Sequence, residues 1–128
     1  ALNRAANYAR ERVVFGRPIG QNQGIQHPLA EAWAYLESAW WMCLRAASLY
    51  DSKQPCGAEA NAAKLLGARA AFDACKKAVM THGGMGYAKE YQVERLFRES
   101  MLPMLAPVTE QLILSFIGEN VLDLPKSY

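Results

Sequence analysis

The sequence predicts an all-α fold, an antiparallel four-helix bundle with no sheet. Apolar residues recur at alternating steps of three and four over two long segments, which is the period of an amphipathic helix. Glycine and proline gather between the predicted helices, and no stretch alternates strictly between apolar and polar residues as a strand does. Because the connections are short, neighbouring helices should run antiparallel. We expect a single bundle domain over residues 1–128.

The first predicted helix covers residues 1–12, where strong helix formers dominate. No N-cap residue precedes it, so we expect Ala1 to lie inside a longer natural helix and the chain to be part of a larger protein. Gly16 and Pro18 then interrupt the helical pattern. Residues 13–22 are therefore predicted to be a connecting loop.

The second predicted helix covers residues 23–51 and has two apolar lines. Its main line steps by three and four and consists of Ile25, Leu29, Ala32, Leu36, Ala39, Cys43, Ala46 and Tyr50. Its second line recurs every seven residues and consists of Trp33, Trp40 and Ala47. The apolar surface is therefore wide, and we expect this helix to contact partners on more than one side. The chain is accordingly predicted to self-associate as a homo-oligomer.

The third predicted helix covers residues 55–82 and follows a turn over residues 51–57. Its core line is rich in small residues and consists of Ala58, Asn61, Leu65, Ala68, Phe72, Cys75 and Val79. Alanine at so many positions lets neighbouring helices approach closely, which favours a tightly packed bundle.

The remaining helices are shorter. A charged helix is predicted over residues 91–100, and prolines then exclude a regular helix interior over residues 101–108. The last helix is predicted over residues 109–122, with Thr109 as its N-cap and a short tail over residues 122–128. Its predicted inward side chains are Leu112, Phe116 and Ile117.

A cluster of glycines separates the third helix from the charged one. Gly83, Gly84 and Gly86 remove Cβ atoms where the helix ends, so the backbone can adopt positive φ and approach another group closely. Two interpretations are open for this stretch. It is either a helix C-cap followed by a solvated helix with Glu–Arg pairs, or a backbone surface for a ligand.

Composition excludes several classes of function. A net charge of +2 is far below the basic excess typical of a nucleic-acid-binding domain. The three cysteines lack metal-ligand spacing, which predicts free, mostly buried thiols in a reducing compartment and no metal site. No run of about 18 apolar residues predicts a membrane span, and no signal peptide opens the sequence.

Four segments together resemble the C-terminal all-α domain of the acyl-CoA dehydrogenases. In order, they are YARERVVFGRPIGQNQ, AKLLGARAAFDACKKAV, HGGMGYAKEYQVERLFRES and the TEQ that opens the last helix. The resemblance covers essentially the whole chain. It implies a flavoprotein subunit with an N-terminal helical domain, a middle β domain and this bundle, of which the first two are expected to be missing here.

The resemblance also implies an activity. Family members oxidise an acyl-CoA between Cα and Cβ with FAD and pass the electrons to an electron-transfer flavoprotein. The implied assembly is a dimer or a tetramer, and the implied location is a bacterial cytoplasm or a mitochondrial matrix, not a secreted one. We expect this domain alone to be catalytically incomplete and not to bind FAD tightly.

The resemblance assigns one group of residues to the FAD of a neighbouring subunit. The Arg and Phe of the family's RxxFG element match Arg12 and Phe15, and the Gln that bonds the adenosine part matches Gln23. The glycine pair whose backbone approaches the same nucleotide matches Gly83 and Gly84. Alternatively, Arg12 is a solvated helix end and Phe15 is a core anchor.

A second group is assigned to the FAD of its own subunit. Thr109 and Gln111 match the family's Thr-x-Gln/Glu at the start of the last helix, although Thr109 is equally suited to a bare N-cap. One family position departs from the pattern. Met80 stands where the family often has a Gln three residues ahead of the glycine pair, so that contact is not expected here.

The position of the catalytic base is where this sequence departs most from the family's pattern. Many family members carry it as a Glu just before the last helix, and an ungapped alignment places Pro107 there. Nearby Glu110 lies in the first helical turn, where the helix dipole explains a carboxylate without catalysis. The base is then a Glu on the preceding part of the first helix, or it comes from a different partner subunit, or the chemistry is altered. The alternative function is a non-catalytic helical assembly module that kept the fold and lost the base.

Overall fold

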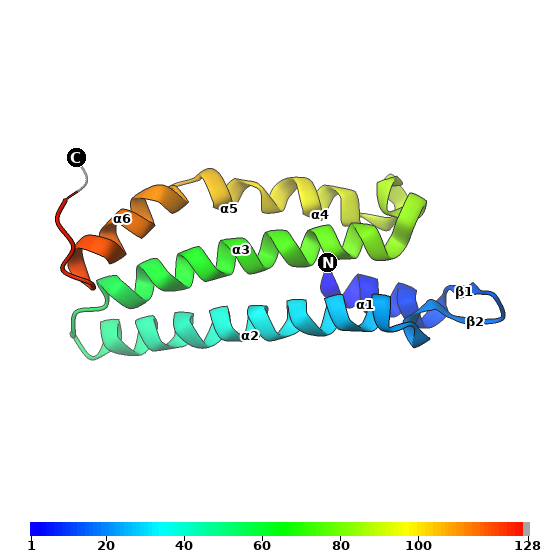
Figure 1. Cartoon of the computed structure of the whole chain (residues 1–128), viewed down its shortest axis with the longest axis horizontal. Coiled ribbons are helices and arrows are strands. Elements are labelled where there is room, and N and C mark those ends of the chain that lie inside the picture. The colour runs from blue at the N-terminus through cyan, green and yellow to red at the C-terminus, as the bar shows by residue number, and fades with distance from the viewer. Residues whose placement is uncertain (127–128) are drawn as a thin grey trace.

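Long helices dominate the computed structural model of this chain, which describes residues 1–126. Helices α2 and α3 run antiparallel side by side, α4, α5 and α6 form a broken line along α3, and the short α1 packs beside α2 and α3 (Figure 1). The predicted all-α antiparallel bundle is confirmed. The bounds of the helices are α1 Leu2–Glu11, α2 Gln23–Asp51, α3 Gly57–His82, α4 Val93–Ser100, α5 Leu102–Leu105 and α6 Glu110–Asn120.

The helix bounds differ from the predicted ones in a few places. Helix α2 has the predicted bounds, whereas α3 begins two residues later than predicted. Two 3-10 turns, Gly83–Tyr87 and Lys89–Tyr91, delay the start of α4. Helix α5 occupies part of the predicted irregular stretch, because its proline lies in the first turn, where a missing N–H costs no hydrogen bond. Residues 127–128 of the predicted tail lie outside the described residues.

A small hairpin replaces the plain loop predicted after α1. Strand β1 (Val13–Val14) pairs antiparallel with β2 (Arg17–Pro18), and a 3-10 turn over Ile19–Gln21 leads into α2. Phe15 and Gly16 form the tip with φ of 52° and 77°, the left-handed pair that suits the twist of a two-residue hairpin. The prediction of no sheet is corrected to this one pair of two-residue strands, which is too short to give an alternating pattern in the sequence.

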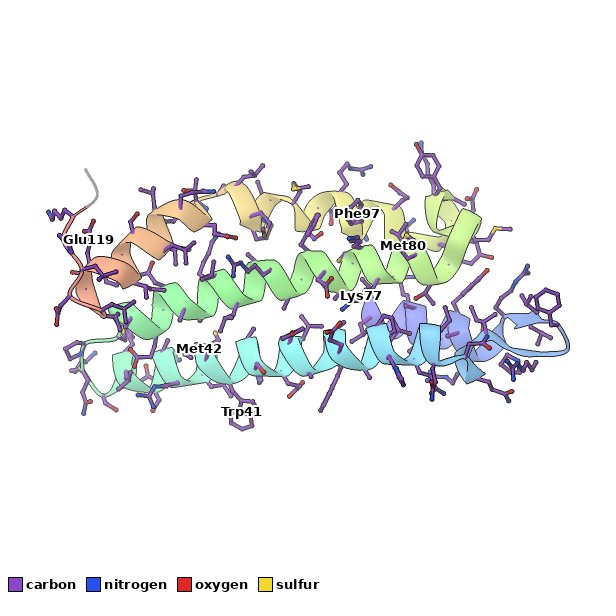
Figure 2. The ribbon with its side chains drawn as sticks, viewed as in Figure 1. Trp41, Met42, Lys77, Met80, Phe97 and Glu119 are labelled. Atoms are coloured by element: carbon purple, nitrogen blue, oxygen red, sulfur yellow. The ribbon has the colours of Figure 1, made fainter. Side chains whose placement is uncertain are left out.

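Small residues form the core. Ala5 on α1, Ala78 on α3 and Val93 on α4 are all fully buried in one cluster, so three helices meet there at close range. Farther along the bundle, the ring centroids of Phe72 and Phe97 lie 5.3 Å apart between α3 and α4 (Figure 2). Alanine packing therefore fixes the separation of the helices, and aromatic side chains fill the wider gaps.

The inward face of α6 differs from the predicted one by one residue. Ile113 is 1% exposed, whereas Leu112, which was predicted to point inward, is 52% exposed. Phe116 and Ile117 are half-buried as predicted. Positions 112 and 113 both lie about one turn before these two residues, so the helical period admits either, and the packing of α6 against α3 covers Ile113.

Several large side chains remain exposed on α2. Trp33, Trp40 and Trp41 are 59%, 57% and 66% exposed, and Trp41 points away from the bundle (Figure 2). Single exposed apolar side chains are ordinary, but three tryptophans on one helix form an apolar surface that is typical of an interaction site.

The cysteines are free thiols, as predicted, but they are not mostly buried. Cys43 is exposed and the other two are half-buried. No group of three or more metal-ligating side chains lies together within residues 1–126. In the same part of the chain, no single helix is long and apolar enough to cross a membrane, although the bent pair of residues 93–105 and 110–120 passes a test of length and composition.

Candidate functional site

A hollow of about 440 Å³ lies where α1, the hairpin and the C-terminal end of α3 meet. Segments about 70 positions apart in the sequence line it together. It brings together three of the predicted cofactor residues, Arg12, Gly83 and Gly84, and the divergent Met80 also lines it. The other lining residues are Tyr8, Val14, Ile19, Thr81, His82 and Met85.

The backbone of Arg12 is held on both sides. Its amide donates to the carbonyl of Tyr8 at 2.8 Å, which closes α1, and its own carbonyl accepts from the amide of Ile19 at 2.8 Å. The residue therefore keeps a fixed place between helix and hairpin, while its side chain is exposed at the hollow. A guanidinium at such a position can pair with an anion through two parallel hydrogen bonds.

The three glycines after α3 serve different purposes. Gly83 has φ of 57° and ψ of −135°, a conformation that side chains rarely permit. A Cβ on Gly86 would lie 2.4 Å from the carbonyl oxygen of Val79, so packing within this chain requires that glycine. A Cβ on Gly84 would meet nothing within 4 Å. Packing within this chain therefore does not require a glycine at position 84.

Tyr8 and His82, which line the hollow, belong to an aromatic cluster. The ring of His82 stacks on Tyr8 with centroids 4.3 Å apart, and Tyr91 meets both rings edge-on. His82 is 5% exposed, and its Nδ1 pairs with the carbonyl of Ala78 at 2.8 Å, which assigns the proton to Nδ1. This cluster was not predicted, because no local pattern in the sequence connects residues 8 and 82.

Two further predicted cofactor residues do not line the hollow. Phe15 is 100% exposed at the tip of the hairpin, which rules out the alternative that it is a core anchor of this chain. Its φ of 52° is a strained conformation for a non-glycine residue. Gln23 is exposed at the first position of α2.

The second predicted group lies at the start of α6, where Glu110 contacts Arg69 near the middle of α3. Thr109 caps α6, since its Oγ1 accepts from the amide of Leu112 at 3.5 Å, which confirms the N-cap prediction. Gln111 is exposed in the first turn of the same helix. Helix α6 lies at the opposite end of the molecule from the hairpin (Figure 1). One chain thus presents two separate sets of predicted cofactor residues.

Neither residue considered for the catalytic base is suited to that role. Pro107 is exposed and has no titratable group. Glu110 receives two hydrogen bonds from Arg69, one from Nε at 3.1 Å and one from Nη2. These hydrogen bonds are the main reason that the pKa of Glu110 lies below its usual value. A carboxylate with a lowered pKa is a weaker base, so Glu110 serves as an ion-pair partner.

The Arg69–Glu110 pair predicts a dependence of stability on pH. Because the pKa of Glu110 is lowered in the folded protein, the pair stabilises the fold fully above the unfolded value of 4.5. This stabilisation is lost as the pH falls through the folded pKa. We expect Glu110→Gln to lower the free energy of unfolding at neutral pH and to have a vanishing effect in acid. Urea unfolding of both proteins across this range measures the difference, and a difference that persists unchanged in acid contradicts the expectation.

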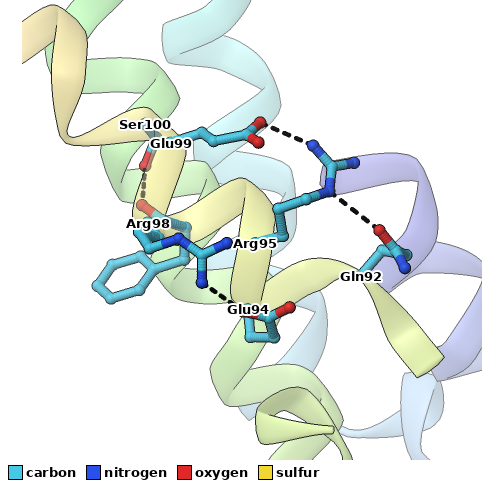
Figure 3. A network of polar contacts seen from close by, with 7 residues as sticks. Gln92, Glu94, Arg95, Arg98, Glu99 and Ser100 are labelled. Carbon is cyan, nitrogen blue, oxygen red and sulfur yellow. Dashed lines mark hydrogen bonds and ion pairs between the residues drawn. The ribbon is translucent and has the colours of Figure 1, made fainter. Parts of the chain in front are cut away.

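The charged side chains of α4 pair with one another along the helix. Arg95 donates to Gln92 at 3.0 Å and to Glu99 at 2.7 Å, while Arg98 donates to Glu94 at 3.1 Å (Figure 3). Such i,i+4 pairs stabilise an exposed helix by about 0.3 to 0.5 kcal/mol each. For this half of the glycine-rich stretch, the interpretation as a solvated helix with Glu–Arg pairs is therefore sufficient.

Comparison with known proteins identifies the family. Residues 1–122 match the family model described as acyl-CoA dehydrogenase, C-terminal domain. The chain is 40% identical over 130 residues to an acyl-CoA dehydrogenase of Mycobacterium tuberculosis, covering 100% of this chain and 34% of that protein. It is 38% identical over 128 residues to the mitochondrial short-chain specific acyl-CoA dehydrogenase of Bos taurus, covering 100% and 30%.

Solved structures agree with the sequence matches. The butyryl-CoA dehydrogenase from Megasphaera elsdenii superposes with a TM-score of 0.92 at 30% identity, over 94% of this chain and 32% of that one. This chain therefore spans about a third of the length of its relatives. The chain belongs to the acyl-CoA dehydrogenase family, and residues 1–122 correspond to its C-terminal domain.

Proposed function

We propose that this domain works as part of an FAD-dependent acyl-CoA dehydrogenase that oxidises an acyl-CoA at Cα–Cβ. In this proposal the domain is joined to an N-terminal helical domain and a middle β domain, and electrons pass to an electron-transfer flavoprotein in a bacterial cytoplasm or a mitochondrial matrix. The hollow that joins Arg12 to Gly83 and Gly84 is the observation that carries the proposal.

The residues at the hollow fit the cofactor. Arg12 offers a planar, permanently charged donor for the pyrophosphate, and the bare backbone at Gly84 leaves room for a nucleotide to approach. Phe15 and Gln23 extend this set along the hairpin and the start of α2. When bound, FAD supplies the hydride acceptor of the reaction, and this chain contributes binding and orientation.

The two sets of residues imply that the cofactor is shared between subunits. In this proposal the hollow holds the FAD of a neighbouring copy, and Thr109 and Gln111 hold the FAD of their own subunit. The separation of the two sets supports the proposal, because Glu110 contacts Arg69 in the middle of α3, whereas Gly83 follows the last residue of that helix, about 20 Å farther along its axis. The exposed tryptophans of α2 offer an apolar surface for such an assembly, a dimer or a tetramer.

The base that removes the Cα proton comes, in this proposal, from outside the described segment. Pro107 cannot accept a proton, and Glu110 is held by Arg69. The base is then a Glu carried by the part of the first bundle helix that precedes this chain, or by a partner subunit. A burial-tuned carboxylate next to the thioester carbonyl is the chemical requirement in either case.

Flavin content tests this proposal. The purified protein that carries this domain should show the visible absorbance of bound flavin, or regain it after incubation with FAD. Acyl-CoA should then bleach the flavin and reduce an artificial electron acceptor. A protein that contains no flavin and cannot be reconstituted overturns the proposal.

A second candidate function is a helical assembly subunit without catalysis. Three residues favour it, namely Pro107 at the usual base position, Met80 in place of a cofactor contact, and Glu110 in its ion pair. Flavin that stays bound but is never reduced by acyl-CoA thioesters of any chain length would support this candidate. Turnover with any acyl-CoA excludes it.

A further inference from the structure

The segment that joins α5 to α6 is held to α3 at both of its ends. Lys64 donates from Nζ to the carbonyl oxygen of Pro103, and Arg69 donates twice to Glu110. Within residues 1–126, these are the side-chain hydrogen bonds that link the segment 103–110 to α3. The two cations stand five positions apart on α3, about 7.5 Å along the helix axis.

Between these two attachments the exposed residues have little other support. Leu105 and Val108 are 63% and 40% exposed, and Pro107 has no amide hydrogen to donate. The amide of Ala106 donates to Leu102 and closes α5, and the next turn begins where Ile113 donates to Thr109. Met104 and Ala106 are half-buried and Ile113 is buried, so apolar packing holds α5 and α6, and the contacts from α3 add a restraint on the exposed residues between them.

The geometry points to Arg69 as a positioning residue for the FAD contacts at the start of α6. Glu110 lies between Thr109 and Gln111 in the first helical turn, so anchoring its carboxylate fixes the orientation of both neighbours. This inference rests on the proposed function of those two residues. It assigns to Glu110 the role of an anchor and removes it from the candidates for the base.

An arginine suits this role better than a lysine. Nε and Nη2 contact the two oxygens of one carboxylate, and such a fork restrains rotation as well as distance. A lysine offers a single point charge and leaves the carboxylate free to turn. Arg69→Lys should therefore keep the positive charge but retain only part of the restraint on the Glu110 carboxylate.

Hydrogen–deuterium exchange on the purified protein without FAD tests the restraint. We expect Arg69→Met and Glu110→Gln each to speed amide exchange over residues 109–114 about threefold to tenfold. The double variant should exchange no faster than either single one, because both changes remove the same contact. Arg45→Met is the matched control, since it breaks the exposed Arg45–Glu59 pair between α2 and α3 and should leave this segment unchanged. Exchange that is unaltered in Arg69→Met, or additive in the double variant, overturns the inference.

The rate of FAD release gives a second test of whether Arg69 positions Thr109 and Gln111. Arg69→Met should release FAD about threefold to tenfold faster than the unsubstituted protein, with Arg69→Lys between the two. If the unsubstituted protein binds no FAD, the proposed function fails, while the exchange experiment still decides whether the restraint exists. If Glu110→Gln abolishes turnover and Arg69→Met does not, Glu110 is a base, and the inference is wrong.

Discussion

Gly86→Ala should destabilise this domain by about 2 to 3 kcal/mol. An added Cβ would lie 2.4 Å from the carbonyl oxygen of Val79 and 3.1 Å from its carbonyl carbon. These are backbone atoms in the last turns of α3, so no side chain can rotate away to relieve the clash. The 3-10 turn that carries the glycine must shift instead. Urea unfolding followed by circular dichroism measures the change.

The neighbouring glycine provides the control for this experiment. Gly84→Ala lies in the same 3-10 turn and meets nothing within 4 Å, so its effect on the free energy of unfolding should stay within about 0.5 kcal/mol. Equal destabilisation by both substitutions would show that the turn tolerates no side chain at all, which contradicts the assignment of separate purposes to the two glycines.

The main effect of Gly84→Ala should be weaker binding of FAD. We expect the affinity for FAD to fall at least about tenfold in the protein that carries this domain, because a methyl group at this position occupies the space through which the nucleotide approaches the backbone. Titration of the apoprotein with FAD, followed by quenching of the flavin fluorescence, measures this affinity.

At position 84, the effect on FAD affinity should therefore be separate from the effect on the free energy of unfolding. A fall in FAD affinity without a fall in the free energy of unfolding is the expected outcome. Unchanged affinity would mean that the outward direction of position 84 is open solvent in the assembled protein. In that case, the glycine pair does not mark the cofactor site.

The helices could be predicted from the sequence because each is set by a local period. Helix α2 has the predicted bounds, and Thr109 caps α6 as expected from its position before a helical run. The period alone placed Leu112 inward, whereas the structure buries Ile113. Both residues are apolar, and only the contact with α3 and its neighbours decides which of the two is covered.

The site could be predicted only through the family resemblance. Residues 12 and 83 lie far apart in the sequence, and the fold brings them to one hollow because α1 and α3 run parallel and their C-terminal ends lie together. The Arg69–Glu110 contact spans 41 positions, and charges on exposed helix faces give no signal for their partners. The conformation of Phe15 was equally hidden, since positive φ at an aromatic residue depends on the hairpin that encloses it.

In the proposed assembly each FAD is held by two copies of this domain, and subunit mixing tests this sharing most directly. Gly84→Leu blocks the hollow, and Gln111→Trp blocks the start of α6, where the exposed position should tolerate a large side chain. Each variant assembled alone should contain little flavin. A mixed dimer places both blocks in one site and leaves the other site intact, so mixed dimers isolated after co-expression should contain flavin in about half of their sites. Mixed assemblies that contain no more flavin than either variant alone would contradict a cofactor shared between subunits.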